Sequence, residues 1–194
     1  MPPLLLIDGH PDPDPARFGH ALADAYAAGA AEAGHVLERI DLCRLDLPLL
    51  RRVADYREGA PPPAAAQAQA AIERAGHLVL IYPLWLGDLP ALTKGFLEQV
   101  LRPGFADAGT TALGMPKGRL TGRSVRLAVT MAMPALAYRW WFGAHSLRSL
   151  ERNVLGLAGL GPIRRTLMGG VEQATPERRA GWLSEMRALG RAGA

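Results

Sequence analysis

Cysteine is nearly absent from this sequence, since Cys43 is the single one among 194 residues. One cysteine supports neither an intrachain disulfide framework nor a cysteine zinc cluster, so the fold does not depend on an oxidising compartment. The sequence also lacks any apolar run near the roughly 20 residues that a membrane-spanning helix needs. Its short apolar start ends at Asp8 and has neither the basic residues nor the length of a signal peptide. We therefore expect a cytoplasmic location.

A cluster of charges of one sign is missing as well. The net charge is only +4, and the basic residues occur singly or in pairs such as Arg51-Arg52 and Arg178-Arg179, with Asp and Glu between them. The pattern contains no basic stripe with stacking aromatics, which is typical of nucleic-acid-binding proteins. We predict no nucleic-acid partner. The histidines lack the spacing of metal ligands, and we predict no bound metal.

Hydrophobic residues are abundant, at 49% of the chain, beside 21% charged residues. This balance can fill a packed core and argues against a disordered chain. A length of 194 residues fits one ordinary domain. We therefore expect residues 1–194 to form a single domain.

Five short apolar runs alternate with helical patterns. We predict strands at residues 4–7, 36–41, 77–82, 125–130 and 163–168. We predict helices over 18–33, 67–75, 91–101 and 144–158, a last helix opening at Pro176, and a surface loop around the prolines at 61–63. Apolar strands separated by helices are typical of a parallel sheet that is covered on both faces. The predicted fold is α/β: a flavodoxin-like, doubly wound, five-stranded parallel sheet in the order 2-1-3-4-5, with helices on both faces.

In such a sheet, ligands bind beyond the carboxyl ends of the strands, at the switch point between strands 1 and 3. The loop after the first predicted strand holds neither a dinucleotide fingerprint nor a P-loop. It runs into a helix N-terminus, where free N–H groups favour an anion, and His10 and Arg17 can add polar contacts. A capped turn without a ligand is the alternative interpretation of this loop.

The loop after the third predicted strand places Trp85 between Pro83 and Pro90 and before Gly87. Backbone amides in a proline-braced turn can face the edge of a planar ring while apolar side chains cover the face of the ring. The alternative is that Trp85 packs at the edge of the core.

Several strings of this sequence resemble the NAD(P)H:quinone oxidoreductase family with the flavodoxin-like fold. They are Pro83-Leu84-Trp85, Leu89-Pro90-Ala91-Leu92-Thr93-Lys94-Gly95-Phe96, Arg102-Pro103-Gly104-Phe105-Ala106 and His10-Pro11. That family includes diaphorase-type quinone reductases, modulator-of-drug-activity-type reductases and ancillary subunits of glutathione-gated potassium efflux systems. The resemblance covers most of the chain.

The resemblance implies a flavin whose phosphate lies on the first loop, which follows the first predicted strand. Its ring lies against the second loop, which follows the third predicted strand, and against the third loop at residues 131–138, which follows the fourth. The resemblance implies cofactor contacts from His10, Phe18, Pro83, Leu84, Trp85, Leu86, Gly87 and Thr130, and Arg17 is a further expected contact although it departs from the family pattern. Tyr138 and His145 match the Tyr and His that lie near the flavin and the quinone oxygens in the family, and they are the expected catalytic residues. The alternative for Tyr138 is a place in the core or at an interface, and the alternative for His145 is an ordinary polar residue at the start of a helix. At Arg17-Phe18-Gly19 many relatives have Ser-Phe-Asn, so Arg17 is expected to replace two polar phosphate contacts.

The expected function is therefore flavin-dependent NAD(P)H oxidation, with two-electron, ping-pong reduction of quinone-like acceptors. FMN is favoured over FAD, which stays open. The alternative is a flavin-binding ancillary subunit of a membrane transporter with little turnover of its own, and only this alternative needs a membrane partner. A homodimer is expected to bury Phe96, Trp140, Trp141 and Phe142.

Overall fold

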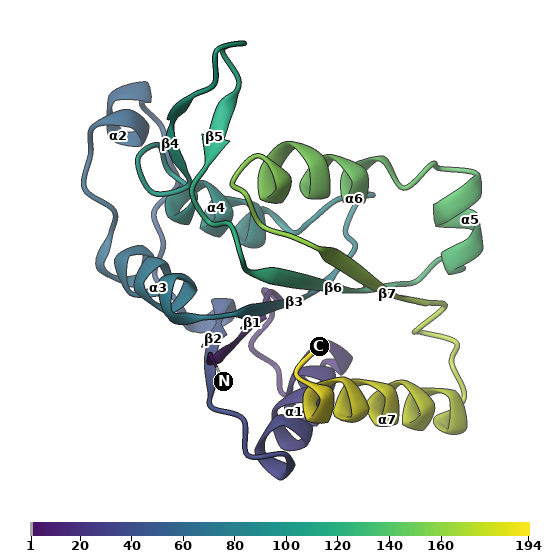
Figure 1. Ribbon diagram of the computed structural model, residues 1–194. Coiled ribbons are helices and arrows are strands. Elements are labelled where there is room, and N and C mark those ends of the chain that lie inside the picture. Colours follow the sequence, from purple (N-terminus) through teal and green to yellow (C-terminus); the bar gives the residue numbers. More distant parts are fainter. Residues whose placement is uncertain (1) are drawn as a thin grey trace.

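The computed structural model describes residues 2–194 and contains a five-stranded sheet. All pairings in this sheet are parallel, and the strand order is β2-β1-β3-β6-β7, as predicted (Figure 1). The strands are β1 (Leu4–Asp8), β2 (Leu37–Asp41), β3 (His77–Pro83), β6 (Ser124–Met131) and β7 (Ile163–Gly169). Every residue of β1 and β3 is buried, which explains why these strands are apolar on both faces.

Helices cover the two faces of the sheet. One face carries α1 (Phe18–Glu32) and α7 (Pro176–Ala192), which lie side by side (Figure 1). The other carries α3 (Pro63–Arg74), α4 (Ala91–Val100) and α6 (His145–Ser149), the last continuing into a π-helical segment over Leu150–Gly156. Each face has its own hydrophobic core, so the predicted two-layer covering is confirmed.

Some elements were not predicted. They are a 3₁₀ turn (Leu42–Arg44), α2 (Val53–Arg57), α5 (Ala135–Trp140) and an antiparallel hairpin of β4 (Asp107–Thr110) and β5 (Pro116–Gly118). The predicted proline-rich loop is shorter than expected because α3 already begins at Pro63. Proline is tolerated at the first helical position, where its missing N–H has no intrahelical partner to lose.

The contact between α1 and α7 is unusually close because glycines lie at the crossing. A Cβ atom on Gly29 would lie 1.9 Å from the carbonyl oxygen of Arg187, and one on Gly190 would lie 2.1 Å from that of Tyr26. Glu32 on α1 also forms ion pairs with Arg187 and Arg191 of α7. These contacts fix α7, whose first turns lie beside the ligand-binding edge of the sheet.

Candidate functional site

A hollow of about 400 Å³ lies at the carboxyl ends of β1, β3 and β6, where the architecture predicts a ligand. Its walls come from the first loop, the start of α1, the second loop, the end of β6 and the region before α7. The lining residues are His10, Asp12, Ala16, Arg17, Phe18, Gly19, Pro83, Leu84, Trp85, Thr130, Met131, Ala132, Val171, Glu172 and Arg179. The volume is within the usual range for a small-molecule site.

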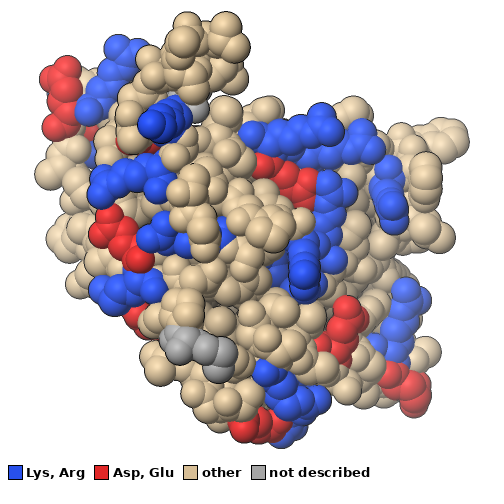
Figure 2. Space-filling model, in the orientation of Figure 1, with Lys and Arg blue, Asp and Glu red and all other residues tan. Residues whose placement is uncertain are grey.

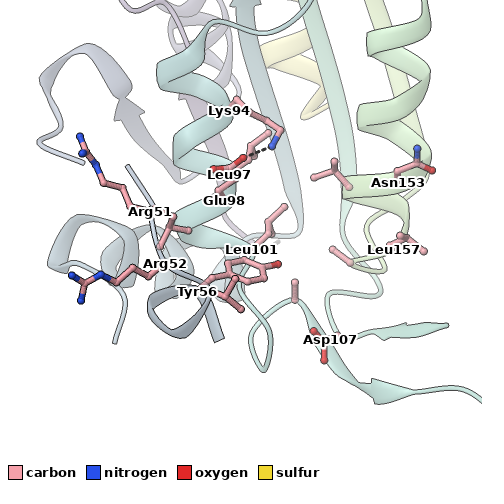
Figure 3. Close-up of a pocket in the computed structure, with 15 residues that line it drawn as sticks. Arg51, Arg52, Tyr56, Lys94, Leu97, Glu98, Leu101, Asp107, Asn153 and Leu157 are labelled. Carbon is pink, nitrogen blue, oxygen red and sulfur yellow. Dashed lines mark hydrogen bonds and ion pairs between the residues drawn. The ribbon is translucent and has the colours of Figure 1, made fainter. Parts of the chain in front are cut away.

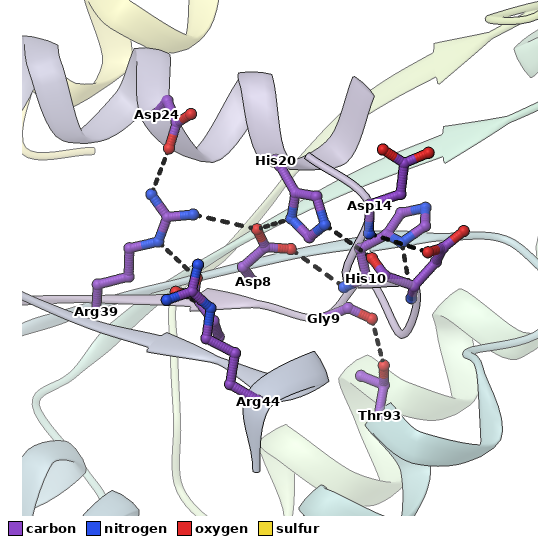
Figure 4. Close-up of polar contacts among 11 residues, drawn as sticks. Asp8, Gly9, His10, Asp14, His20, Asp24, Arg39, Arg44 and Thr93 are labelled. Carbon is purple, nitrogen blue, oxygen red and sulfur yellow. Dashed lines mark hydrogen bonds and ion pairs between the residues drawn. The ribbon is translucent and has the colours of Figure 1, made fainter. Parts of the chain in front are cut away.

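The first loop is held by a series of side-chain turns. The N–H of Asp12 donates to Nδ1 of His10 (3.2 Å), and the N–H of Asp14 donates to Oδ1 of Asp12 (3.0 Å). The N–H of Ala16 then donates to Oδ1 of Asp14 (3.0 Å). Thr93 of α4 anchors the start of the loop by donating its hydroxyl to the carbonyl of Gly9 (2.7 Å; Figure 4). The loop therefore has a defined shape before it reaches α1.

A buried charge network lies behind this loop (Figure 4). The carboxylate of Asp8, which is fully buried, accepts hydrogen bonds from the N–H of His10 (3.1 Å) and from Nδ1 of His20 (2.6 Å). A guanidinium nitrogen of Arg39 lies 3.4 Å from the same carboxylate oxygen as His20. Arg39 also pairs with Asp24 and Asp41, so β2 supplies a charged support for the end of β1.

The two histidines of this region have pKa values shifted in opposite directions. Burial lowers the pKa of His10 below 6.5, and the nearby His20 lowers it further. Burial alone would also lower the pKa of His20, but hydrogen bonds to Asp8 and to the carbonyl of Asp12, with the charge of Asp8, raise it above 6.5. One histidine is therefore held neutral and its neighbour is favoured as a cation.

The start of α1 offers donors to an anion. The N–H groups of Phe18 and Gly19 have no acceptor within the described chain, and both residues line the hollow. Arg17 lines it too, but its guanidinium lies 2.7 Å from the carboxylate of Asp12 and 3.4 Å from that of Asp14. The free donors that the predicted anion site needs are therefore present, while its predicted arginine is already paired. Anion binding by this loop stays a prediction.

Arg179 of α7 is a lining residue that the sequence did not reveal. Its guanidinium lies 5.4 Å from the ring centre of Phe18, and it donates to the carbonyl of Val171 (2.7 Å). Among residues 2–194, no carboxylate lies within ion-pair distance of Arg179. A cation near a helix N-terminus opposes the helix dipole, and this signal could have singled it out in the sequence.

The second loop forms a tight turn at the opposite end of the hollow. Trp85 and Asp88 exchange two backbone hydrogen bonds of 2.9 Å each, while Leu86 and Gly87 between them have positive φ values of 49° and 82°. The side chain of Leu86 is fully exposed, and the left-handed conformation costs a non-glycine residue about 1–2 kcal/mol. An exposed leucine in a strained turn is a feature found at functional sites.

The turn leaves two of its four amides free. The N–H of Leu84 donates to the carbonyl of Thr130 (2.7 Å), and that of Trp85 donates to Asp88. Within the described chain, the N–H groups of Leu86 and Gly87 have no acceptor. The Trp85 ring, 49% exposed, packs edge-on against His10 at 6.2 Å. Trp85 is thus not a core residue, and it bridges the two loops.

The two expected catalytic residues do not line the hollow. Tyr138 is buried on α5, and its hydroxyl lies 2.9 Å from Oγ of Ser146. His145 is exposed at the start of α6. Tyr138 ends the third loop and His145 follows it, as predicted, but within one chain neither residue lines the hollow. Their catalytic roles stay predictions.

A larger hollow of about 600 Å³ lies elsewhere, between α4, the residues around α2 and the π-helical segment (Figure 3). Leu97, Leu101 and Leu157 line it, and Lys94 and Glu98 pair with each other at its rim. Its size is greater, but it lies away from the carboxyl ends of the strands. We assign the functional site to the smaller hollow because the three loops and the free N–H groups at the start of α1 meet there.

Charges on the molecular surface are mixed. On the face shown in Figure 2, Lys and Arg side chains lie in separate groups, with Asp and Glu beside several of them. Ion pairs such as Arg74–Glu38 and Arg119–Glu73 account for part of this mixing. The expected absence of a nucleic-acid partner stays a prediction. Within residues 2–194, no helix is both long enough and apolar enough to span a membrane.

The family follows from a match that extends over nearly the whole chain. Residues 3–189 match the model of the family described as flavodoxin-like fold. The chain belongs to this family. The flavodoxin-like architecture, the strand order and the position of the hollow agree with this membership.

Two curated relatives and one solved structure place the flavodoxin-like chain among named proteins. An uncharacterised NAD(P)H oxidoreductase of Haemophilus influenzae is 29% identical over 138 residues, which are 70% of this chain and 67% of the relative. Rat NAD(P)H dehydrogenase [quinone] 1 is 25% identical over 69% of this chain, and the match spans only 51% of the rat protein. The structure of an FMN-dependent NADH-azoreductase of Bacillus anthracis, in complex with FMN, has a TM-score of 0.78 at 15% identity and 99% coverage of both chains.

Proposed function

We propose that this protein is a flavin-dependent NAD(P)H oxidoreductase that reduces quinone-like acceptors. The observation that carries the proposal is the hollow itself, which is lined at one end by the start of α1 with its free N–H groups and at the other end by Leu84 and Trp85 of the second loop. Leu86 and Gly87, two of the expected cofactor contacts, follow in the same turn but do not line the hollow within the described chain. The names of the two curated relatives support an NAD(P)H oxidoreductase activity. Ping-pong turnover is part of the proposal, because NAD(P)H and the acceptor would use the same exposed face of the bound flavin ring in succession.

The residues present fit a flavin phosphate and a flavin ring. The N–H groups of Phe18 and Gly19 and the cation of Arg179 suit a phosphate. The N–H groups of Leu86 and Gly87 suit the polar edge of a flavin ring, and no atom lies within 4 Å of the Cβ position of Gly87. Leu84, Trp85 and Met131 offer apolar surface to the ring faces. The phosphate end of the hollow therefore has free donors on its wall, and the ring end has apolar surface, with the free N–H groups of Leu86 and Gly87 in the adjoining turn.

When bound, the flavin would accept a hydride from NAD(P)H and pass two electrons to the acceptor. The chain's own contribution is to position the cofactor and to stabilise negative charge near the ring with the turn amides. Trp85 would cover the ring end of the hollow and hold the second loop against His10. Thr130, through its carbonyl, fixes the amide of Leu84 and hence the approach of that loop.

FMN is the proposed cofactor. It needs one terminal phosphate, and the hollow offers one group of donors around the start of α1. The azoreductase with a similar fold is described as FMN-dependent and was solved with FMN. FAD would have to extend a second phosphate past Asp12 and Asp14, and the one arginine beside these two carboxylates, Arg17, is already paired with both of them.

A homodimer is also part of the proposal. Trp140, Trp141 and Phe142 follow the third loop and are 75%, 86% and 53% exposed. Exposed aromatic clusters of this kind mark interfaces more often than free surface. The prediction for Phe96 was wrong, because this ring is fully buried in the core beneath α4 and cannot lie at an interface. Its helical spacing with Val100 is the pattern of a core-facing stripe.

The test is NAD(P)H oxidation by the purified protein with added FMN and a benzoquinone. The matched variants are Ala132→Trp, which fills the hollow, and Ala31→Trp, which places the same ring on exposed surface at the far end of α1. We expect turnover in the wild type and in Ala31→Trp, and loss of FMN binding and turnover in Ala132→Trp. FMN binding without turnover would favour the ancillary-subunit alternative, and absence of flavin binding would overturn the proposal.

A further inference from the structure

His20 has acceptors at both ring nitrogens. Its Nδ1 lies 2.6 Å from a carboxylate oxygen of Asp8, and its Nε2 lies 2.9 Å from the carbonyl oxygen of Asp12. A peptide carbonyl can only accept, so Nε2 carries a proton. An imidazole is a stronger base than a carboxylate by about 2.5 pKa units in water, which places the other proton on Nδ1. Both nitrogens then donate, and the ring is a cation.

We propose that His20 is a positioning residue that acts as a buried imidazolium, fixing the first loop in its anion-binding shape. This inference rests on the proposed function, since the anion is taken to be the phosphate of FMN. His20 links β1 to the loop, because one side of its ring binds the buried Asp8 and the other side binds Asp12. Loss of its charge removes one of the two donors and releases one side of this link.

The same geometry fixes the state of His10. Its Nδ1 accepts the N–H of Asp12, so a neutral ring carries its proton on Nε2. The ring centres of His10 and His20 lie 5.2 Å apart, and two adjacent cations at this distance would repel each other. His10, which lines the hollow, is therefore kept neutral and presents an N–H donor instead of a charge.

The groups facing His20 define the expected pH dependence. They are Asp8 from β1, His10 and Asp12 from the loop, and Arg39 from β2, while His20 itself lies on α1. The pKa of His20 is raised above 6.5, so the link is complete below that pKa and is lost as pH rises through it. The phosphate of FMN is already mostly ionised above about pH 7, because its second pKa is near 6. A fall in affinity at higher pH is then not caused by the ligand.

The first measurement uses the free protein and does not depend on a cofactor. Nuclear magnetic resonance of ¹⁵N-labelled histidines, with His20 assigned by its absence in His20→Gln, reports the protonation of each ring nitrogen. We expect His20 to titrate with a midpoint above 6.5, with both of its ring nitrogens protonated below that midpoint, and His10 to be neutral there with its proton on Nε2. An unprotonated Nδ1 on His20, or a midpoint at or below 6.5, would overturn the inference.

The second measurement is the dissociation constant of FMN from pH 7 to 9. Wild type and His35→Gln should lose at least threefold in affinity across the measured midpoint of His20, because His35 is half-buried beyond the far end of α1, against the carbonyl of Arg191 and away from the hollow. His20→Gln keeps a donor for Asp12 but carries no charge, so its affinity should be lower at pH 7 and should not change with pH. Identical profiles for His20→Gln and wild type would refute the positioning role. If FMN binds at no pH, the proposed function fails, while the histidine spectra still decide the charge state of His20.

Discussion

The phosphate end of the hollow has two candidate arginines, and their surroundings predict different consequences of removing them. Arg179 has no carboxylate partner among the described residues and lies over Phe18, next to the free amides of α1. Arg17 is already paired with Asp12 and Asp14. An anion can therefore bind Arg179 without breaking an existing ion pair. Removing Arg179 should weaken FMN binding more than removing Arg17.

The magnitude follows from the type of contact. A hydrogen bond to a charged group contributes about 1.5–3 kcal/mol, so Arg179→Ala should weaken FMN binding by roughly 10- to 150-fold. The side chain of Arg17 is half exposed, and exposed ion pairs are worth about 0–1 kcal/mol, so Arg17→Ala should cost less than about fivefold. Arg179→Lys should recover part of the loss because the charge is kept while the planar fork is lost.

The assay is quenching of flavin fluorescence on titration with FMN and with riboflavin. Riboflavin has no phosphate, so wild type, Arg17→Ala and Arg179→Ala should bind it equally. An equal loss for both ligands in Arg179→Ala would mean that the variant disturbs the fold. A larger loss of FMN affinity in Arg17→Ala than in Arg179→Ala would place the phosphate on Arg17, as the sequence alone suggested.

Three further predictions concern stability and assembly. Gly190→Ala should lower the free energy of unfolding, measured in urea, by about 1–3 kcal/mol, because the new Cβ would lie 2.1 Å from the Tyr26 carbonyl oxygen. Gly181→Ala is the control on the same helix. Its new Cβ would have no atom within 4 Å, so the substitution should be neutral or stabilising by up to about 1 kcal/mol. Burial and the nearby Arg126 and Arg164 lower the pKa of His77 from 6.5 to about 4, so protonation favours the unfolded chain and stability should fall by up to about 3 kcal/mol between pH 6.5 and 4. This part of the pH dependence should vanish in His77→Gln, and an unchanged slope would contradict it. Trp141→Lys should convert a dimer to a monomer by light scattering, and a wild-type mass near 20.7 kDa at micromolar concentration would exclude the dimer.

The centre of the sheet could be predicted from sequence because β1, β3 and β6 are nearly continuous apolar runs, whereas β2 and β7 carry charged residues and are only partly buried. Strands buried on both faces cannot be mistaken for half-exposed ones, and the observed ends differ from the predicted ends by one residue or none. The β4–β5 hairpin gave no such signal. The strand β4 (Asp107–Thr110) is short and largely exposed, and its sequence does not alternate between apolar and polar residues.

The candidate site was predictable only in part, because some of its residues lie far from the predicted loops in the sequence. His10 and Trp85 lie in loops that follow predicted strands, and Phe18 begins the helix after the first of these loops, so topology alone brings them together. Arg179 reaches the hollow only because α7 packs closely on α1 at Gly29 and Gly190, a contact that no local pattern encodes. The protonation of His20 likewise depends on the simultaneous presence of Asp8 and Asp12, which becomes visible only in three dimensions.

The most direct test of the central claim is to mix the FMN-loaded protein with NADPH or NADH in the absence of oxygen and any acceptor, and to follow the yellow colour of the flavin. The account predicts that the protein binds one FMN per chain, that the colour bleaches in a single turnover, and that a benzoquinone added afterwards restores it. A protein that binds no FMN, or whose bound FMN keeps its colour in the presence of both nucleotides, would contradict the account.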